Sequence, residues 1–217
     1  MNNDRRAFLK FGLAGAAVVG GLSQLLRVSP HAFNESLTRK FLGAKREAPT
    51  FPRDRAREPR ANGDVGLDEE VTDWSLKIEA PGLATKSMSL EEVKSLPRVE
   101  MTTELMCVEG WSEVVHWTGT PLRHIAPPQA PEYVSLTTPD KSYFVGLDLE
   151  SAMHPQTLLA WEMNGQPLTS EHGAPLRLVI PVKYGIKNIK RIGTIQFTAQ
   201  RPADYWANRG YDWYAAL

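Results

Sequence analysis

The chain has 217 residues, with 25 basic and 25 acidic side chains and therefore no formal net charge at pH 7. Its hydrophobic content of 42 % is enough for a buried core, and the length suits one substantial domain with terminal extras. The balanced charge gives no indication of nucleic-acid binding. The single cysteine, Cys107, excludes an internal disulfide and any metal site that needs several cysteines, and the haem motif C-x-x-C-H is absent from the sequence.

Residues 1–28 are typical of an export signal. Arg5 and Arg6 begin R-R-A-F-L-K, which matches the twin-arginine pattern R-R-x-F-L-K, and a mildly apolar run extends from Phe11 to Leu26. That run is shorter than the roughly 20 strongly apolar residues of a good spanning helix. A chance arginine pair ahead of a core helix is the alternative. The pattern predicts export of the folded protein to the periplasm, with either cleavage of the signal or its retention as a membrane tether.

Residues 29–70 are expected to form an extended basic arm. Between Arg39 and Arg60 there are eight Lys or Arg residues against three acids, and Pro49, Pro52 and Pro59 interrupt any helix. Three interpretations remain open for this arm, namely a solvated linker, a docking surface for a partner, or a segment that lies along an anionic cofactor.

The globular pattern extends from residue 71 to residue 217. Residues 74–80 alternate apolar and polar side chains, which predicts an accessible edge strand. Ser89 and Glu92 have the spacing of a capping box and predict a short helix over 89–96. Residues 99–106 are predicted to form a strand that leads into Cys107 and a Glu-Gly turn.

The second half of this domain shows further strands and turns. We expect a short helix over 120–125, strands over 133–138 and 143–149, and a turn at Asn164-Gly165 between the apolar runs of 158–168. The aromatic residues of 205–217 are expected to pack back over the core, with an exposed patch for a partner as the alternative.

Residues 171–191 contain five Lys or Arg residues and one acid, and are predicted to form a strand, a turn at Gly185 and a second strand. Basic side chains and N–H groups at such a bend make a concavity that suits the phosphate of a cofactor. The alternative is a basic hairpin on the surface.

Cys107 stands where a strand ends and a loop begins, a position at which folds often place chemistry. A cysteine that only packs in the core is the alternative. Residues 102–122, T-T-E-L-M-C-V-E-G-W-S-E-V-V-H-W-T-G-T-P-L, resemble the cofactor-binding core of the sulfite oxidase family of molybdenum enzymes, with Cys107, Trp111 and the W-T-G-T-P-L of 117–122 as the matching pieces. The form C-V-E-G-W-S is most similar to the branch that contains the bacterial periplasmic methionine sulfoxide reductase catalytic subunit.

The resemblance covers roughly residues 71–197 and includes L-L-A-W-E-M-N-G-Q-P-L at 158–168, similar to the family's L-A-Y-E-M-N-G-x-P-L. It implies an α+β fold of coiled, mainly antiparallel sheets with short helices, and a molybdenum–molybdopterin cofactor whose metal is ligated by Cys107. It also implies Tyr143 as an active-site tyrosine. The other cofactor contacts that it implies are Thr138, His172, Arg177, Asn188, Ile189 and Lys190.

The function implied by the resemblance is oxygen-atom transfer from a small or protein-bound sulfoxide, as in a sulfoxide reductase. Electrons would pass through a cytochrome partner, a membrane b-type cytochrome in the reductase branch. A sulfite dehydrogenase that donates electrons to a c-type cytochrome is the alternative within the family. Outside it, two alternatives remain: a cysteine hydrolase that pairs Cys107 with His116 or His172, and a non-catalytic exported binding module.

Overall fold

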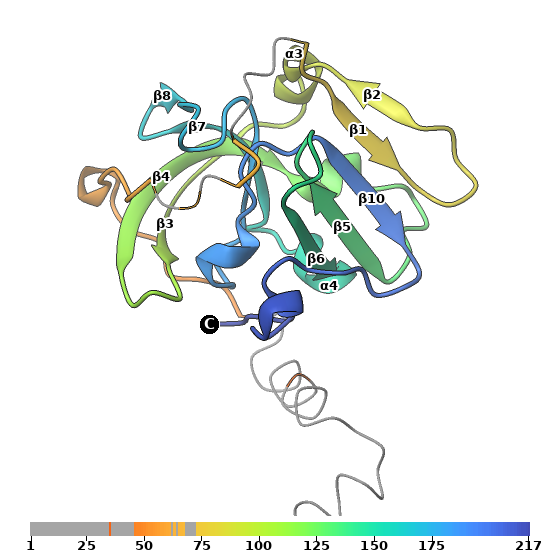
Figure 1. The fold of residues 1–217 in the computed structure, drawn as a ribbon. Helices are drawn as coiled ribbons and strands as arrows, with labels where there is room; N and C mark the ends of the chain where they lie inside the picture. Colours follow the sequence, from red (N-terminus) through yellow and green to blue (C-terminus); the bar gives the residue numbers. More distant parts are fainter. Residues whose placement is uncertain (1–34, 36–45, 62, 64, 68–72) are drawn as a thin grey trace, which may run out of the picture. The chain divides into compact units, whose positions relative to one another are not determined.

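A computed structural model describes residues 35, 46–61, 63, 65–67 and 73–217 (Figure 1). The predicted export signal, residues 1–28, lies outside the described residues. The chain divides into two compact units, residues 1–41 and 42–217, and all the elements described below belong to the second unit. In the part that is described, no helix is long and apolar enough to span a membrane.

One sheet contains the strands that lie on the right in Figure 1. Strand β1 runs parallel to β10, and the other neighbours in this sheet are antiparallel. In the described chain the strands follow the order β2 (Lys86–Met88), β1 (Leu76–Glu79), β10 (Thr194–Thr198), β5 (Tyr133–Thr137) and β6 (Phe144–Asp148).

The second sheet is antiparallel and carries the hairpin that ends near Cys107. A long β3–β4 pair runs from Val99 opposite Gly119 to Met106 opposite Ser112. Within the described residues, its strands are β3 (Val99–Met106), β4 (Ser112–Pro121), β7 (Leu158–Met163) and β8 (Gln166–Pro167), with β9 (Arg177–Val179) also paired to β7.

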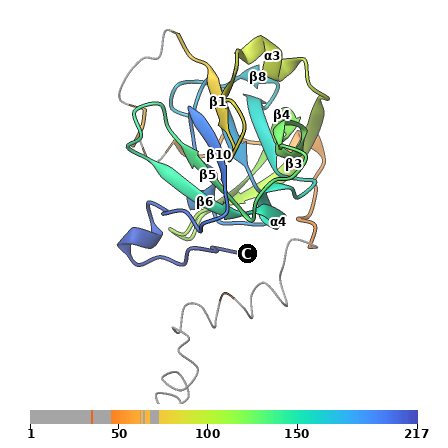
Figure 2. The same cartoon turned by 90° about the vertical axis from the view of Figure 1, so that its right-hand side faces the viewer.

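The two sheets lie next to each other and enclose the main core (Figures 1 and 2). Leu159 and Trp161 of β7 belong to this core, whereas Leu158 and Ala160 belong to a second apolar cluster, because successive strand side chains point to opposite faces. Strand β7 is therefore buried on both faces.

The helical elements are short. The predicted capped helix is α3 (Leu90–Lys94), in which Ser89 accepts a hydrogen bond from the backbone N–H of Glu92 and the Glu92 carboxylate accepts one from the backbone N–H of Ser89. The remaining described helical elements are η1 (Arg53–Arg55), η2 (Leu122–Ile125), α4 (Leu149–Ala152), η3 (Gly185–Lys187) and η4 (Ala207–Arg209). These short helices on mainly antiparallel sheets confirm the predicted α+β fold.

Three local expectations were wrong. Strand β1 is not an edge strand, because β2 pairs with its outer side. The residues before Leu122 belong to β4, a strand of ten residues that the sequence pattern did not indicate. After Gly185 the chain forms the turn η3 rather than a second strand.

The described part of the arm lies along the β3–β4 hairpin. Thr50 bridges to Thr103, and the N–H groups of Phe51 and Arg57 donate to the carbonyl oxygens of Thr102 and Val114 at 3.0 and 2.8 Å. The arm is thereby fixed beside the hairpin up to the residues that reach the cavity described next.

Candidate active site

Cys107 follows directly after β3 and is held by a tight turn. Its N–H donates to the carbonyl oxygen of Trp111 at 2.9 Å, and its carbonyl oxygen accepts a hydrogen bond from Gly110 at 3.2 Å. Gly110 has φ of 87°, a left-handed conformation that favours glycine. The G-W pair of the motif therefore closes the hairpin, and the half-buried cysteine is placed at its tip.

The turn η3 packs directly against this cysteine. A Cβ atom added to Gly185 would lie 3.3 Å from the carbonyl oxygen of Met106 and 3.7 Å from the Cα of Cys107. A larger residue at position 185 would therefore press on the backbone that carries Cys107.

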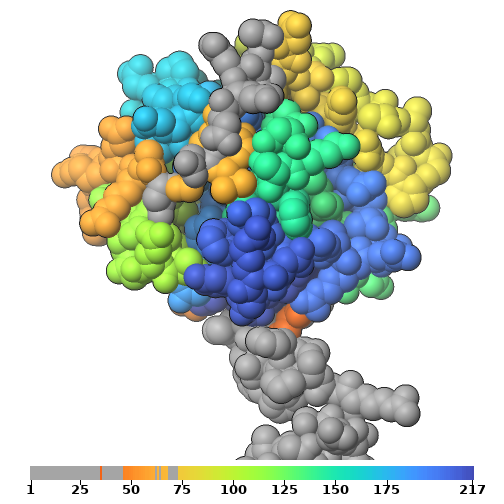
Figure 3. Space-filling model, viewed as in Figure 1, coloured from red at the N-terminus to blue at the C-terminus, as the bar shows by residue number. Residues whose placement is uncertain are grey.

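A cavity of about 360 Å³ opens beside Cys107, where the arm, the hairpin and the C-terminal segment meet on the face shown in Figure 3. The arm contributes residues between Pro59 and Val65 to its lining. Seven of the eight site residues predicted from the sequence line it, namely Cys107, Tyr143, His172, Arg177, Asn188, Ile189 and Lys190.

Thr138 is not among the lining residues. Its hydroxyl accepts a hydrogen bond from the N–H of Tyr143 at 3.1 Å and donates one to Asp140 at 2.6 Å. The structure thus gives Thr138 a role in shaping the turn before Tyr143, and its predicted contact with a cofactor stays a prediction.

Arg177 places a buried positive charge in the cavity wall. Its guanidinium is buried and donates to the carbonyl oxygens of His172 at 3.0 Å and Asn188 at 3.4 Å, while its Nε has no hydrogen-bond partner. Burial lowers the pKa of Arg177 to about 10, so it remains charged at neutral pH. Among the described residues, no carboxylate forms an ion pair with it. A buried cation without a carboxylate favours an anionic ligand.

The arm is tied to the same side of the cavity. The Nε2 atom of His172 lies 3.3 Å from the carboxylate of Glu58, and Lys190 donates to the carbonyl oxygen of Gly63 at 2.9 Å. Burial lowers the pKa of His172, although Glu58 opposes that effect. The polar half of the cavity is therefore made jointly by the arm and by residues 172–190.

Asn188 and Ile189 shape the loop around Arg177. The Asn188 side chain accepts a hydrogen bond from the N–H of Ile180 at 2.8 Å and donates one to the carbonyl oxygen of Tyr184 at 3.2 Å. Ile189 is buried in the main core. These side-chain bonds fix the loop from within, while both residues remain in the cavity lining.

Three other basic residues of 171–191 make their contacts inside the fold. Lys187 pairs with Asp204 at 2.6 Å, Lys183 donates to the carbonyl oxygen of Tyr214 at 2.8 Å, and Arg191 donates to that of Leu67 at 3.1 Å. All three are buried, so the alternative of a basic surface hairpin is wrong. Of the five basic residues, the two that line the cavity are Arg177 and Lys190.

Another part of the cavity lining is aromatic and was not predicted as part of a site. Tyr205, Trp206 and Tyr211 belong to the C-terminal segment, which packs back over the core as expected. The ring of Tyr205 lies 4.9 Å from that of Tyr143, between centroids, and the ring of Trp206 lies 5.1 Å from that of Tyr211. The density of aromatic residues near the end of the sequence was the available signal.

The donor set fits the molybdopterin that the resemblance implies. Within the described residues, no three His, Cys, Asp or Glu side chains gather as a metal site. The cavity instead offers one thiol, that of Cys107, and the buried cation of Arg177. A single thiolate completes the ligands of a metal whose cofactor brings sulfur ligands of its own, and a cation suits that cofactor's phosphate.

Known proteins resemble this chain over most of its length. Residues 62–206 match the family described as oxidoreductase molybdopterin binding domain. A protein of Azospira oryzae, provisionally named as a protein-methionine-sulfoxide reductase subunit, is 33 % identical over 97 % of this chain and 87 % of its own length.

Two further relatives are named as protein-methionine-sulfoxide reductase catalytic subunits. That of Xanthomonas campestris pv. campestris is 40 % identical over 63 % of this chain and 48 % of its own length. That of Campylobacter jejuni subsp. jejuni is 36 % identical over 70 % of this chain and 59 % of its own length. The match therefore spans about half the length of these catalytic subunits.

Among solved structures, the sulfane dehydrogenase SoxCD from Paracoccus pantotrophus has a similar fold. The TM-score is 0.54 at 19 % sequence identity, and the match covers 73 % of this chain and 46 % of that one.

Proposed function

Because the chain belongs to the oxidoreductase molybdopterin-binding domain family, whose cofactor is molybdopterin, we propose that it is the catalytic subunit of a sulfoxide reductase and that Cys107 ligates the molybdenum. The match of residues 62–206 to this family confirms the family resemblance seen in the sequence. The substrate, the metal ligand and the electron partner belong to the proposal.

The observation that carries the proposal is the common cavity of Cys107 and Arg177. The cysteine supplies the one thiolate that a molybdenum–molybdopterin site needs from the protein, and the buried guanidinium supplies positive charge for its phosphate. Bound there, the cofactor would supply two-electron oxygen-atom transfer. The protein residues hold it, exclude water and position the substrate.

Tyr143 contributes a neutral hydroxyl to this cavity. Burial raises its pKa above the ordinary value, so its phenol stays protonated at neutral pH. The phenol donates to the carbonyl oxygen of Ile186 at 2.7 Å, and a hydrogen bond with the Trp206 side chain partly opposes the rise in pKa. Tyr143 is therefore proposed to orient ligands at the cavity wall rather than to act as a base.

The distribution of charge favours a sulfoxide over sulfite. The cations in the lining are Arg60, Arg177 and Lys190, which belong to the arm and to the polar half. The aromatic part of the lining presents rings, which suit an uncharged organic group better than a sulfite dianion. The Arg209 guanidinium lies over one of them, 3.6 Å from the Tyr205 ring centroid, but Arg209 is not a lining residue.

We further propose that the protein is exported by the twin-arginine route and acts in the periplasm. As a sulfoxide reductase it would receive electrons from a membrane b-type cytochrome. Supporting this are the R-R-A-F-L-K motif of the sequence and the absence from it of C-x-x-C-H. The word "subunit" in the names of three relatives also agrees with a separate partner.

Metal analysis and substrate assays test the proposal. The full chain is purified from a host supplied with molybdate, and its molybdenum content is measured together with reduction of methionine sulfoxide by a reduced viologen dye. Near one molybdenum per chain with sulfoxide reduction supports it. Molybdenum with sulfite oxidation alone would establish the sulfite dehydrogenase, and no molybdenum would leave the cysteine hydrolase or the binding module.

A further inference from the structure

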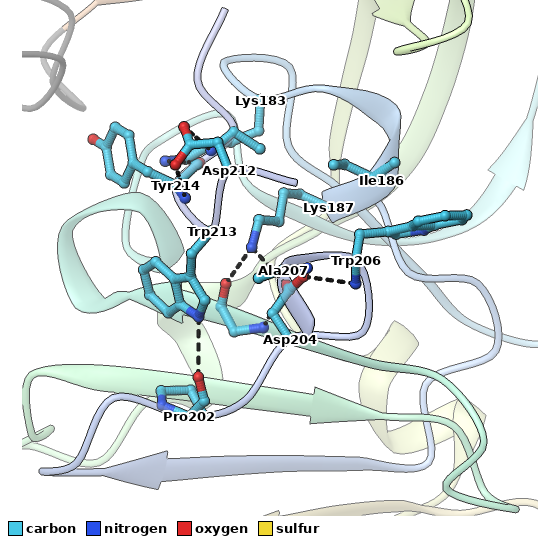
Figure 4. Close-up of polar contacts among 12 residues, drawn as sticks. Lys183, Ile186, Lys187, Pro202, Asp204, Trp206, Ala207, Asp212, Trp213 and Tyr214 are labelled. Carbon is cyan, nitrogen blue, oxygen red and sulfur yellow. Dashed lines mark hydrogen bonds and ion pairs between the residues drawn. The ribbon is translucent and has the colours of Figure 1, made fainter. Parts of the chain in front are cut away.

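A buried ion pair joins the two walls of the cavity (Figure 4). The Nζ atom of Lys187 lies 2.6 Å from the carboxylate of Asp204 and donates to the carbonyl oxygen of Gly146 at 3.0 Å. Both charged side chains are buried, and the Lys187 ammonium lies 4.8 Å from the ring centroid of Trp213. Such a pair is costly to break from one side, because the remaining charge stays buried without a partner.

Asp204 holds the aromatic segment through its second carboxylate oxygen. That oxygen accepts hydrogen bonds from the N–H groups of Trp206 at 3.1 Å and Ala207 at 3.0 Å, as Figure 4 shows. The oxygen that faces Lys187 also accepts one from the N–H of Gly146 at 3.1 Å. One carboxylate therefore fixes the backbone that carries Trp206 to strand β6.

Lys187 belongs to the turn that packs against Cys107. It is the last residue of η3, whose Gly185 faces Cys107 and whose Ile186 accepts the hydrogen bond from Tyr143. The Lys187–Asp204 pair thus sets the position of Trp206 relative to the Cys107 side of the cavity.

Trp206 is the central ring of the aromatic wall. Its centroid lies 5.4 Å from that of Tyr205 and 5.1 Å from that of Tyr211, both in edge-to-face geometry. Tyr211 at the outer end is 44 % exposed, whereas Trp206 is half-buried. The three rings are themselves uncharged, and the Arg209 guanidinium lies 3.6 Å from the centroid of Tyr205.

We propose that Trp206 is a specificity-determining residue that contacts the carbon substituents of the sulfoxide, and that Lys187 and Asp204 are positioning residues that hold it there. This inference rests on the proposed function. The polar half of the cavity takes the anionic cofactor, and the aromatic half is left for a neutral organic sulfur group.

The first test replaces the ring. Trp206→Leu in the holoenzyme is expected to raise the KM for methionine sulfoxide roughly 3- to 10-fold with kcat and molybdenum content unchanged, since apolar contact with the carbon substituents is lost. The smaller dimethyl sulfoxide should lose less. Asn208→Ala, at an exposed position outside the cavity lining, is the matched control. An unchanged KM in Trp206→Leu would overturn the specificity role.

The second test releases the segment. Asp204→Asn is expected to raise the same KM and to speed tryptic cleavage after Arg209, which is exposed in the segment that Asp204 holds. If that variant does not accumulate, the double variant Lys187→Met with Asp204→Asn buries no charge and carries the test. Wild-type cleavage rates in the holoenzyme of either variant contradict the positioning role.

The experiments distinguish a failure of the proposed function from a failure of the inference about Trp206. Wild-type holoenzyme that contains molybdenum but does not reduce sulfoxides contradicts the proposed function before any variant is made. Sulfoxide reduction that Trp206→Leu leaves unaltered contradicts only the inference about the aromatic wall.

Discussion

The phenol of Tyr143 donates a 2.7 Å hydrogen bond to the carbonyl oxygen of Ile186, which joins the strand β6 side of the cavity to the turn that packs on Cys107. The bond also explains why this tyrosine is part of the wall although it lies far from Cys107 in the sequence. Removal of the Tyr143 hydroxyl therefore tests how much this hydrogen bond stabilises the turn η3.

Tyr143→Phe is expected to reduce the free energy of unfolding by about 1 kcal/mol, the usual net value of one hydrogen bond, because the Ile186 carbonyl loses its donor. Burial raises the pKa of Tyr143 above its unfolded value of about 10. Wild-type stability should consequently fall as pH rises above about 10, and the variant should lose part of that dependence. Urea unfolding at pH 8 and pH 10.5 measures both effects. Identical curves for the two proteins at both pH values would contradict the assignment.

Cys107→Ser should remove molybdenum and sulfoxide reduction while the protein still folds. The change keeps the side-chain volume nearly constant, so the cofactor-free forms of variant and wild type should differ by less than about 1.5 kcal/mol in unfolding free energy. Molybdenum content, pterin release and circular dichroism measure the outcome. Sulfoxide reduction at wild-type rates by the variant would exclude ligation by Cys107.

Arg177→Met should weaken retention of the cofactor roughly 10- to 100-fold, because a charged donor to a phosphate is worth about 1.5–3 kcal/mol. The cofactor-free variant should be as stable as wild type or more stable, since a buried charge is removed. Pterin and molybdenum retained after gel filtration are the readouts, and Arg123→Met, at an exposed position, is the control. Equal retention by Arg177→Met and Arg123→Met would exclude Arg177 from the cofactor site.

Acid should destabilise the fold through three histidines. Burial lowers the pKa values of His116, His154 and His172. The unfolded chain then binds protons at about pH 6.5, at which the folded chain does not, so stability is present above this pH and is lost as pH falls below it. Urea unfolding at pH 7.5 and pH 5.5 should show the loss, and His154→Gln should diminish it. An equal loss in wild type and His154→Gln would contradict the contribution of His154.

The sequence was sufficient for much of the fold and for the residues around Cys107. The capping box of Ser89 and Glu92, the strand of 99–106 and the turn at Asn164-Gly165 are set by local patterns, and all three occur in the structure. Strand β4 was missed because its V-V-H-W-T-G-T-P sequence contains glycine and proline. Gly119 is there because a side chain would collide with the carbonyl oxygen of Leu159 in the neighbouring strand, a contact that no local pattern reveals.

For the same reason, the sequence could not predict which basic residues of 171–191 make contacts inside the fold and which line the cavity. Lys187 and Lys183 are buried because Asp204 and the carbonyl group of Tyr214 lie beside them in the fold. Arg177 has no such acidic partner among the described residues, and this difference arises from tertiary packing alone. Charge counts along the sequence identified the stretch but not which cation faces the cavity.

The cavity wall combines Pro59, Arg60, Gly63 and Val65 with Tyr205, Trp206 and Tyr211, which are far apart in the sequence. Contacts of such long sequence separation cost loop-closure entropy that local contacts do not. A polypeptide that stops before Asp204 would leave the cavity open on its aromatic side and would lack the partner of Lys187. We therefore expect stable loading with the cofactor to require synthesis of the chain through residue 211.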